Sequence, residues 1–348
     1  MTFEYRGQEV GIVSLKINGG SITNELIYGE VSGVKKDENG NGLEGAVIGL
    51  FTAAGQEPVI TAVSADDGSF SFKAVPCGEN ELRELEAPEG YVLNETPYAV
   101  SIDQQGAVIE AEITDTLIRG SVQLTKVDKD HPDHHLSGAV FEVYSGDSLI
   151  GVMEEISDGV YRLDGLEYGE YTLRETVAPE GFYPDENIYS FSIRENGATV
   201  IVENETGGCF IDQAQTGRIR IRKTSSDGVL AGFTFRVTGT DVTGNTFSRE
   251  YVTDGTGEIL IENLRIGEYV VHEVKNSANA GYILPHDVKV TVHAEKTVVA
   301  KFYNRLKPVD IPKTGDSTNM TLWAVLAGAS LLGALASAFF TIRRKNEV

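Results

Sequence analysis

Three sets of ionisable side chains recur along the chain at matching intervals. Each set has one lysine, a glutamate 49 or 50 residues later, and an aspartate or asparagine a further 31 or 37 residues on. Strand residues alternate between two faces, and apolar residues two positions away share the face of most of these charged residues. We therefore expect each set to point into a core. The sets are Lys35/Glu84/Asp115, Lys126/Glu175/Asp212 and Lys223/Glu273/Asn304.

Burial of these charges suggests a covalent reaction. An isolated buried charge is very costly, and a buried ion pair often only breaks even. Desolvation lowers the pKa of a lysine, which becomes a nucleophile when neutral, and raises the pKa of a glutamate, which can then polarise a carbonyl and shuttle protons. We expect a Lys–Asp or Lys–Asn amide, with water or ammonia released. The alternative is a hydrogen-bonded ionic trio without covalent closure. Lys36 competes with Lys35 but falls on the opposite face.

The elements that would position these residues are short β-strands in three internal repeats. Opening, middle and closing segments align from one repeat to the next. Short strands with turn residues at regular intervals predict an all-β fold of tandem immunoglobulin-like β-sandwiches. The expected repeats span 29–117, 118–215 and 216–307.

The first 28 residues resemble the end of a further repeat. Asn24 stands five residues before Gly29, as Asp115 stands five before Gly120. We expect residues 1–28 to be the remnant of an upstream repeat closed by Asn24; the alternative is an extra strand on the first repeat. The polar start of the chain has no apolar core of a secretory signal, which predicts that the true N-terminus is missing.

Composition excludes some classes of partner. The chain has 29 Lys+Arg and 52 Asp+Glu, a formal net charge of −23. Such an acidic protein is a poor candidate for binding nucleic acid or an anionic membrane surface. Cys77 and Cys209 fall in different repeats, so we expect two free thiols rather than a disulfide.

The C-terminal end combines a short motif, an apolar run and a basic cluster. A linker, residues 308–319, contains Ile311, Pro312, Lys313, Thr314 and Gly315 in sequence. An apolar run at 320–342 is long enough for a transmembrane helix, and the basic tail at 343–348 would stay in the cytoplasm. Everything before this helix is therefore expected outside the membrane.

The repeats resemble the collagen-adhesin B-type domains, also called prealbumin-like or pilin domains, of Gram-positive surface proteins. The resemblance rests on the opening Lys-x-Asp, the Leu-x-Gly-Ala turn and a Glu-x-x-Ala-Pro-x-Gly-aromatic box at 84–91 and 175–182, and it covers roughly residues 28–307. It implies autocatalytic isopeptide bonds Lys35–Asp115, Lys126–Asp212 and Lys223–Asn304, promoted by Glu84, Glu175 and Glu273. The first two repeats close with Asp where Asn is commoner. The third lacks Ala-Pro after its glutamate and reads Lys-x-Ser, so it departs from the family pattern at both places.

The tail resembles a sortase sorting signal of the Leu-Pro-x-Thr-Gly type, with Ile311 in first place. The resemblance implies cleavage between Thr314 and Gly315, and transfer of the Thr314 carboxyl to peptidoglycan or to a pilin lysine. The partners implied are thus sortase and the cell wall of a Gram-positive bacterium, reached through a single-pass membrane precursor. An ordinary anchor preceded by a chance pentapeptide is the alternative.

These features predict a structural stalk for an adhesin or ancillary pilin, whose host or extracellular ligand would be bound by a missing N-terminal region. The alternatives are a sortase-polymerised pilus backbone subunit and the stalk of a wall-anchored enzyme. We find no catalytic set for turnover and expect no enzyme activity, cofactor or metal. The Asp37–Gly42 segment has Ile48, not Glu, at the twelfth position of a calcium loop, and His131, His134 and His135 are expected in a solvated loop.

Overall fold

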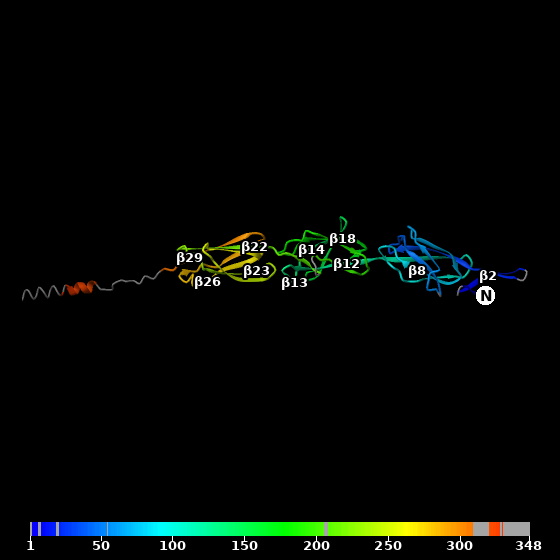
Figure 1. Ribbon diagram of the computed structural model, residues 1–348, viewed down its shortest axis with the longest axis horizontal. Helices are drawn as coiled ribbons and strands as arrows, with labels where there is room; N and C mark the ends of the chain where they lie inside the picture. Colours follow the sequence, from blue (N-terminus) through cyan, green and yellow to red (C-terminus); the bar gives the residue numbers. More distant parts are fainter. Residues whose placement is uncertain are drawn as a thin grey trace, which may run out of the picture.

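The computed structural model describes residues 2–5, 8–18, 21–53, 55–204, 208–308, 320–327 and 329. In Figure 1 the three repeats follow one another along one axis, with the N-terminal strands at one end and the C-terminal helical segment at the other. The prediction of an all-β fold of tandem sandwiches is confirmed.

The first repeat is a sandwich of two four-stranded sheets. One sheet has the order β10-β8-β5-β6 and the other the order β7-β4-β11-β9. The strands are β4 (Tyr28–Asp37), β5 (Val47–Thr52), β6 (Ile60–Val63), β7 (Ser69–Pro76), β8 (Gly78–Glu86), β9 (Tyr91–Val92), β10 (Tyr98–Ile102) and β11 (Val108–Leu117).

The second repeat has the same two layers with a divided closing strand. Its sheets are β15-β14-β18-β19 and β13-β12-β17-β16, and both β20 and β21 pair with β12. The longer spacing before Asp212 thus reflects a segment inserted between β20 and β21. The strands are β12 (Arg119–Asp128), β13 (His131–His135), β14 (Val140–Ser145), β15 (Ser148–Val152), β16 (Glu154–Ser157), β17 (Val160–Glu167), β18 (Gly169–Val177), β19 (Ile188–Ile193), β20 (Thr199–Ile201) and β21 (Phe210–Asp212).

The prediction that the three histidines lie in a loop is wrong in one respect. His131 and His135 bound a short strand, β13, that pairs antiparallel with β12 across an irregular register. Side chains of this strand are mostly exposed, and the described residues contain no group of three or more side chains arranged to hold a metal ion.

The third repeat returns to a continuous closing strand. Its sheets are β25-β22-β29-β27 and β24-β23-β26-β28. The strands are β22 (Thr216–Ser225), β23 (Thr234–Asp241), β24 (Thr246–Val252), β25 (Glu258–Arg265), β26 (Gly267–Val274), β27 (Tyr282–Ile283), β28 (Val288–Val292) and β29 (Thr297–Leu306).

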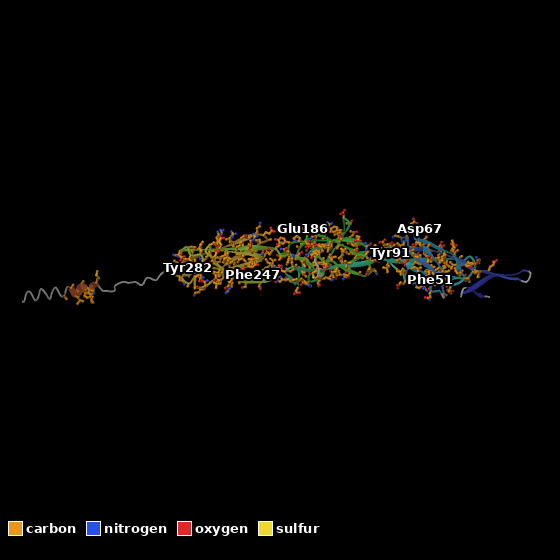
Figure 2. All side chains as sticks on the ribbon, viewed as in Figure 1. Phe51, Asp67, Tyr91, Glu186, Phe247 and Tyr282 are labelled. Atoms are coloured by element: carbon orange, nitrogen blue, oxygen red, sulfur yellow. The ribbon has the colours of Figure 1, made fainter. Side chains whose placement is uncertain are left out.

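Each repeat encloses its own apolar core between its two sheets. The strands alternate inward and outward residues, and Figure 2 shows the side chains filling three successive bodies, with Phe51 in the first and Phe247 in the third. Gly33 of β4 takes the place held by Leu124 in β12. A Cβ at Gly33 would lie 2.1 Å from the Phe70 ring, so the missing side chain is replaced by that ring.

The two ends of the chain are described only in part. At the N-terminal end, β1 (Thr2–Tyr5), β2 (Gln8–Asn18) and β3 (Ser21–Leu26) form a separate antiparallel sheet in which Asn24 pairs with Leu15. Asn24 is therefore on a hairpin strand, whereas Asp115 is on a strand that runs parallel to its partner.

At the C-terminal end, residues 320–327 and 329 are helical. No helix in the described part of the chain is long and apolar enough to cross a membrane. The rest of the predicted span, and the motif from Ile311 to Gly315 with the proposed Thr314 cleavage point, lie outside the described residues.

Candidate functional site

Strand register brings the three members of each set together. In every repeat the closing strand runs parallel to the opening strand, and the lysine lies opposite an apolar residue of the closing strand. The aspartate or asparagine stands two residues further on and so shares the inward face. The glutamate comes from the facing sheet and completes the set across the core. The cross-strand pairs are Lys35↔Ile113, Lys126↔Phe210 and Lys223↔Phe302.

In the first repeat the predicted set is assembled and buried. The Lys35 ammonium donates a short hydrogen bond to Asp115 Oδ1 and lies 2.8 Å from Glu84 Oε1. All three side chains have a relative exposure of 0%. Lys36 instead reaches Glu112 on the outer face, with its Nζ 2.6 Å from Oε2, which separates it from this centre.

The second repeat repeats this geometry. The Lys126 ammonium donates to Asp212 Oδ1 and lies 3.0 Å from Glu175 Oε1. It also sits 4.5 Å from the centroid of the Phe210 ring, the residue opposite it on β21. Asp115 Oδ2 and Asp212 Oδ2 have no hydrogen-bond partner among the described residues.

The charges of these two centres do not balance if every group is ionised. Two carboxylates and one ammonium would leave a net negative charge in a dry core, and burial penalises that state. Burial accordingly raises the pKa of the Glu84 carboxyl above its usual range. Burial also raises the pKa of Asp212 to about 7, against the opposing influence of Lys126. Each centre is thus disposed to keep one carboxyl protonated.

The third repeat arranges its set differently. Asn304 Nδ2 donates to Glu273 Oε1 at 2.6 Å, but no hydrogen bond joins Lys223 to Asn304 among the described residues. The Lys223 ammonium donates to the carbonyl of Thr224 at 2.8 Å and lies 3.7 Å from the centroid of the Phe233 ring. Burial lowers the pKa of the Lys223 amine, which favours its neutral, nucleophilic form.

A loop contact on each glutamate was not foreseen from the sequence. The backbone N–H of Asn94 donates to Glu84 Oε2 at 2.7 Å, and that of Asp185 donates to Glu175 Oε2 at 2.8 Å. Each donor lies ten residues after its glutamate. A backbone donor has no signature in residue type, so only its constant spacing could have indicated it.

The junction between the second and third repeats carries a partly buried ion pair that sequence patterns also missed. Arg265 donates two hydrogen bonds to Asp128, at 2.5 and 2.8 Å, and a third to Asp130 at 2.9 Å. Burial opposes ionisation of Asp128, but the bonds from Arg265 prevail and hold its pKa below the usual range. At the preceding junction, Arg119 pairs with Glu38 in a more exposed setting.

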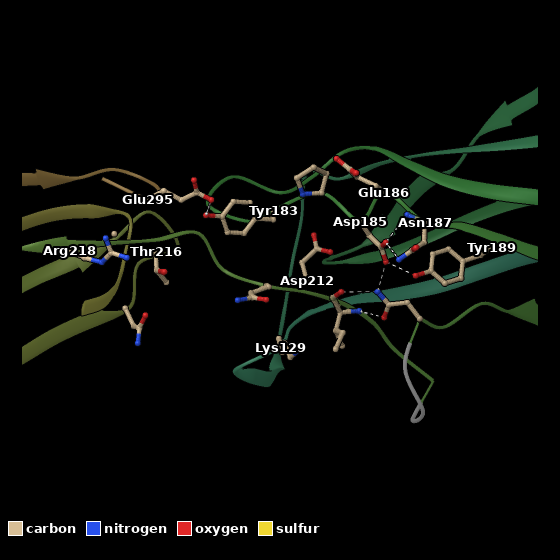
Figure 3. Close-up of a pocket in the computed structure, with 16 residues that line it drawn as sticks. Lys129, Tyr183, Asp185, Glu186, Asn187, Tyr189, Asp212, Thr216, Arg218 and Glu295 are labelled. Atoms are coloured by element: carbon tan, nitrogen blue, oxygen red, sulfur yellow. Dashed lines mark hydrogen bonds between the residues drawn. The ribbon is translucent and has the colours of Figure 1, made fainter. Parts of the chain in front are cut away.

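A polar groove of about 1070 Å³ lies at this same junction (Figure 3). Asp212 is among the residues that line it, although its side chain is buried in the centre of the second repeat. Asp185 on its wall accepts hydrogen bonds from Tyr189 Oη at 2.6 Å and Asn204 Nδ2 at 2.9 Å. The side chains of Asp185, Tyr189 and Asn204 thus hydrogen-bond to one another.

Comparison with known families agrees with this architecture. Residues 29–117, 120–206 and 217–306 each match the SpaA prealbumin-like fold domain. The chain therefore belongs to the SpaA family of prealbumin-like domains, as three tandem copies. In the second copy the match stops before β21, whose position follows the inserted segment.

Individual proteins are similar to this chain at low sequence identity. The Staphylococcus epidermidis serine-aspartate repeat-containing protein F is 23% identical over 291 residues, which are 71% of this chain and 16% of that protein. The Bacillus anthracis TIE protein shares the fold, with a TM-score of 0.65 at 24% identity, over 82% of this chain and 52% of that chain. The Bacillus cereus major pilin subunit BcpA gives a TM-score of 0.41 at 14% identity, over 80% and 100% of the two chains.

Proposed function

We propose that this protein is the stalk of a Gram-positive surface adhesin or ancillary pilin, stiffened by one intramolecular isopeptide bond in each repeat. The observation that carries the proposal is the paired geometry of Lys35 with Asp115 and of Lys126 with Asp212. Each pair joins residues 80 or 86 positions apart inside a dry core, beside a glutamate. A simple ionic trio gives little reason to place two acids around one lysine in two repeats.

The reaction would proceed by attack of a neutral lysine on a protonated partner. In the second repeat, proton transfer within the centre leaves the Lys126 amine neutral and a carboxyl protonated. The amine attacks Cγ of Asp212, a C–O bond breaks, and the departing oxygen leaves as water. Glu175 relays protons and is unchanged at the end. The groove bordered by Asp212 offers the water a way out.

The third repeat would release ammonia. The neutral Lys223 amine attacks Cγ of Asn304, the bond to Nδ2 breaks, and Nδ2 leaves as ammonia with the proton lost by the amine. Glu273 contacts this leaving nitrogen and is placed to pass the proton to it. The amine must first leave the Thr224 carbonyl, so we expect this bond to form more slowly than the other two.

Intact mass is the direct test of these bonds. Each aspartate bond removes about 18 Da and the asparagine bond about 17 Da, so closure of all three lowers the mass of the ectodomain by about 53 Da. Variants E84A, E175A and E273A should each restore the mass of one repeat only. A wild-type mass equal to the sequence mass would refute the covalent proposal and leave three ionic trios.

Anchoring is a separate part of the proposal. We infer that sortase cleaves after Thr314 and joins its carboxyl to peptidoglycan or to a pilin subunit. Substitution T314A should move the protein from the cell-wall fraction to the membrane fraction. Equal recovery of wild type and variant in the wall fraction would contradict this, and a ladder of high-mass species on a denaturing gel would instead indicate polymerisation.

A further inference from the structure

Every repeat supplies one hydrogen bond from a loop to its buried glutamate, but the third repeat uses a different donor. In the first two repeats the donor is a backbone N–H, that of Asn94 or Asp185. In the third, the side-chain amide of Asn279 donates to Glu273 Oε1 at 3.1 Å, six residues after the glutamate. This is the repeat whose loop lacks the Ala-Pro sequence.

The surroundings of Asn279 fix the direction of its amide. Its residue exposure is 1%, and its Oδ1 accepts the backbone N–H of Asn276 at 2.8 Å. Its Nδ2 also donates to the carbonyl of Val274 at 2.9 Å. Because a backbone N–H can only donate and a carbonyl can only accept, the nitrogen of Asn279 must be the atom that faces Glu273.

This contact determines how Glu273 meets the reacting amide. Oε1 of Glu273 accepts from both Asn279 and Asn304, while Oε2 has no hydrogen-bond partner among the described residues. Asn279 therefore holds the carboxyl with Oε1 on the Asn304 nitrogen.

We propose that Asn279 is a positioning residue for Glu273 in closure of the Lys223–Asn304 bond, replacing the backbone donors of the other repeats. The inference rests on the isopeptide chemistry proposed above. It has a practical consequence: the third repeat is the one in which the loop donor can be removed by a single side-chain substitution.

The test follows bond formation in the full ectodomain made by cell-free synthesis, sampled over time at several pH values. Acid quenching, proteolysis and mass spectrometry then measure each cross-linked peptide. In N279A we expect the Lys223–Asn304 bond to form about 10- to 100-fold more slowly, because one hydrogen bond to a charged group is lost. N279D, which keeps the size of the side chain but loses the donor, should be slowed as well. The introduced carboxyl can donate to Glu273 only when it is protonated, so the rate of N279D relative to that of N279A should rise as the pH falls.

The same chain contains its controls. Bonds Lys35–Asp115 and Lys126–Asp212 should form at unchanged rates in both variants. The matched variant S277A changes an exposed side chain of the same loop as Asn279, so its effect on the third bond should stay within a few-fold. Hydrogen exchange of β22 and β29 amides reports whether the third repeat is folded.

The outcomes separate this inference from the proposed function. Slower closure in a folded third repeat, with recovery of N279D relative to N279A at low pH, supports a positioning role. Closure that N279A and N279D leave at the wild-type rate, or two variants whose rates keep a constant ratio as the pH falls, overturns the role of Asn279 and leaves the isopeptide proposal intact. Absence of the Lys223–Asn304 peptide in wild type, beside closed bonds in the other repeats, overturns both for the third repeat.

Discussion

The second and third repeats place lysine, glutamate and closing residue in the same strand register, yet the lysines find different partners. Lys126 contacts two carboxyl groups, whereas Lys223 contacts a backbone carbonyl and an aromatic ring. In the third repeat, Glu273 instead accepts hydrogen bonds from two side-chain amides. The change of one closing residue from Asp212 to Asn304 removes one acid from the centre. Strand register therefore brings the groups together, and the balance of charges in each centre determines which groups pair.

The balance of charges in each centre also predicts which group carries an extra proton. Two acids around Lys126 leave one carboxyl protonated, which is reflected in the raised pKa of Asp212. One acid near Lys223 leaves no surplus, and burial acts on the amine instead. The two centres therefore approach electrical neutrality in different ways.

The largest expected difference comes from removing the lysines. In K126M two buried acids lose their cation, which we expect to lower the free energy of unfolding of the second repeat by about 3–5 kcal/mol. In K223M, Glu273 keeps its amide donors, and we expect about 1–3 kcal/mol. Each variant also loses the isopeptide bond of its own repeat, so the contribution of that bond to stability largely cancels when the two variants are compared. Hydrogen exchange of core amides in β12 and β22 measures the loss of unfolding free energy in each repeat. Equal losses would show that the different charge balance of the two centres does not affect their stability.

A smaller effect concerns pH in a second repeat that cannot close because its lysine is absent, as in K126M. Burial raises the pKa of folded Asp212 to about 7 against the opposing influence of Lys126, and K126M removes that influence, while the unfolded residue loses its proton near its ordinary value of 3.8. The folded state then binds more protons between these values, so stability is greatest at low pH and falls as pH rises towards 7. The contribution of Asp212 to this slope should approach about 1.4 kcal/mol per pH unit.

Its control is the double variant K126M/D212N, in which the contribution of Asp212 to that slope should be lost. Hydrogen exchange of β12 amides, corrected for intrinsic rates, follows both proteins. A stability of K126M that rises between pH 4 and 7 would show that Asp212 is not the group that retains the proton.

The smallest effect concerns the ring beside Lys223. The turn before β23 has Phe233 where the first two repeats have Ala46 and Ala139. Replacement F233L should cost about 1–2 kcal/mol through lost packing and lost cation–π contact. If the ring holds the amine away from Asn304, the same variant should also speed closure of the third bond. Cross-linked peptide yields over time check this, and slower closure in a folded repeat would oppose it.

Much of this arrangement could be predicted from sequence because it depends on local alternation. The inward faces of Lys126, Glu175 and Asp212 follow from the period of two, and the repeat spacing identifies which strands must meet. The longer spacing before Asp212 corresponds to the segment that divides β20 from β21, which the structure shows and the sequence analysis did not predict.

Other contacts depend on distances that no local pattern contains. Arg265 reaches Asp128 across 137 residues and between two repeats, so neither residue type nor periodicity singles the pair out. Asn279 could have been suspected, because it stands in the loop that lacks Ala-Pro. Its role nevertheless depends on the turn that places its amide on Glu273, and that turn is set by tertiary packing.

Long sequence separation within each centre has a consequence for proteolysis. Lys35 and Asp115 enclose most of the first repeat, including exposed loops such as the one that carries Asp67. Once these two side chains are joined, a protease cut in such a loop opens a ring but does not release a fragment. The protein would then remain in one piece after damage that severs an ordinary chain of tandem domains.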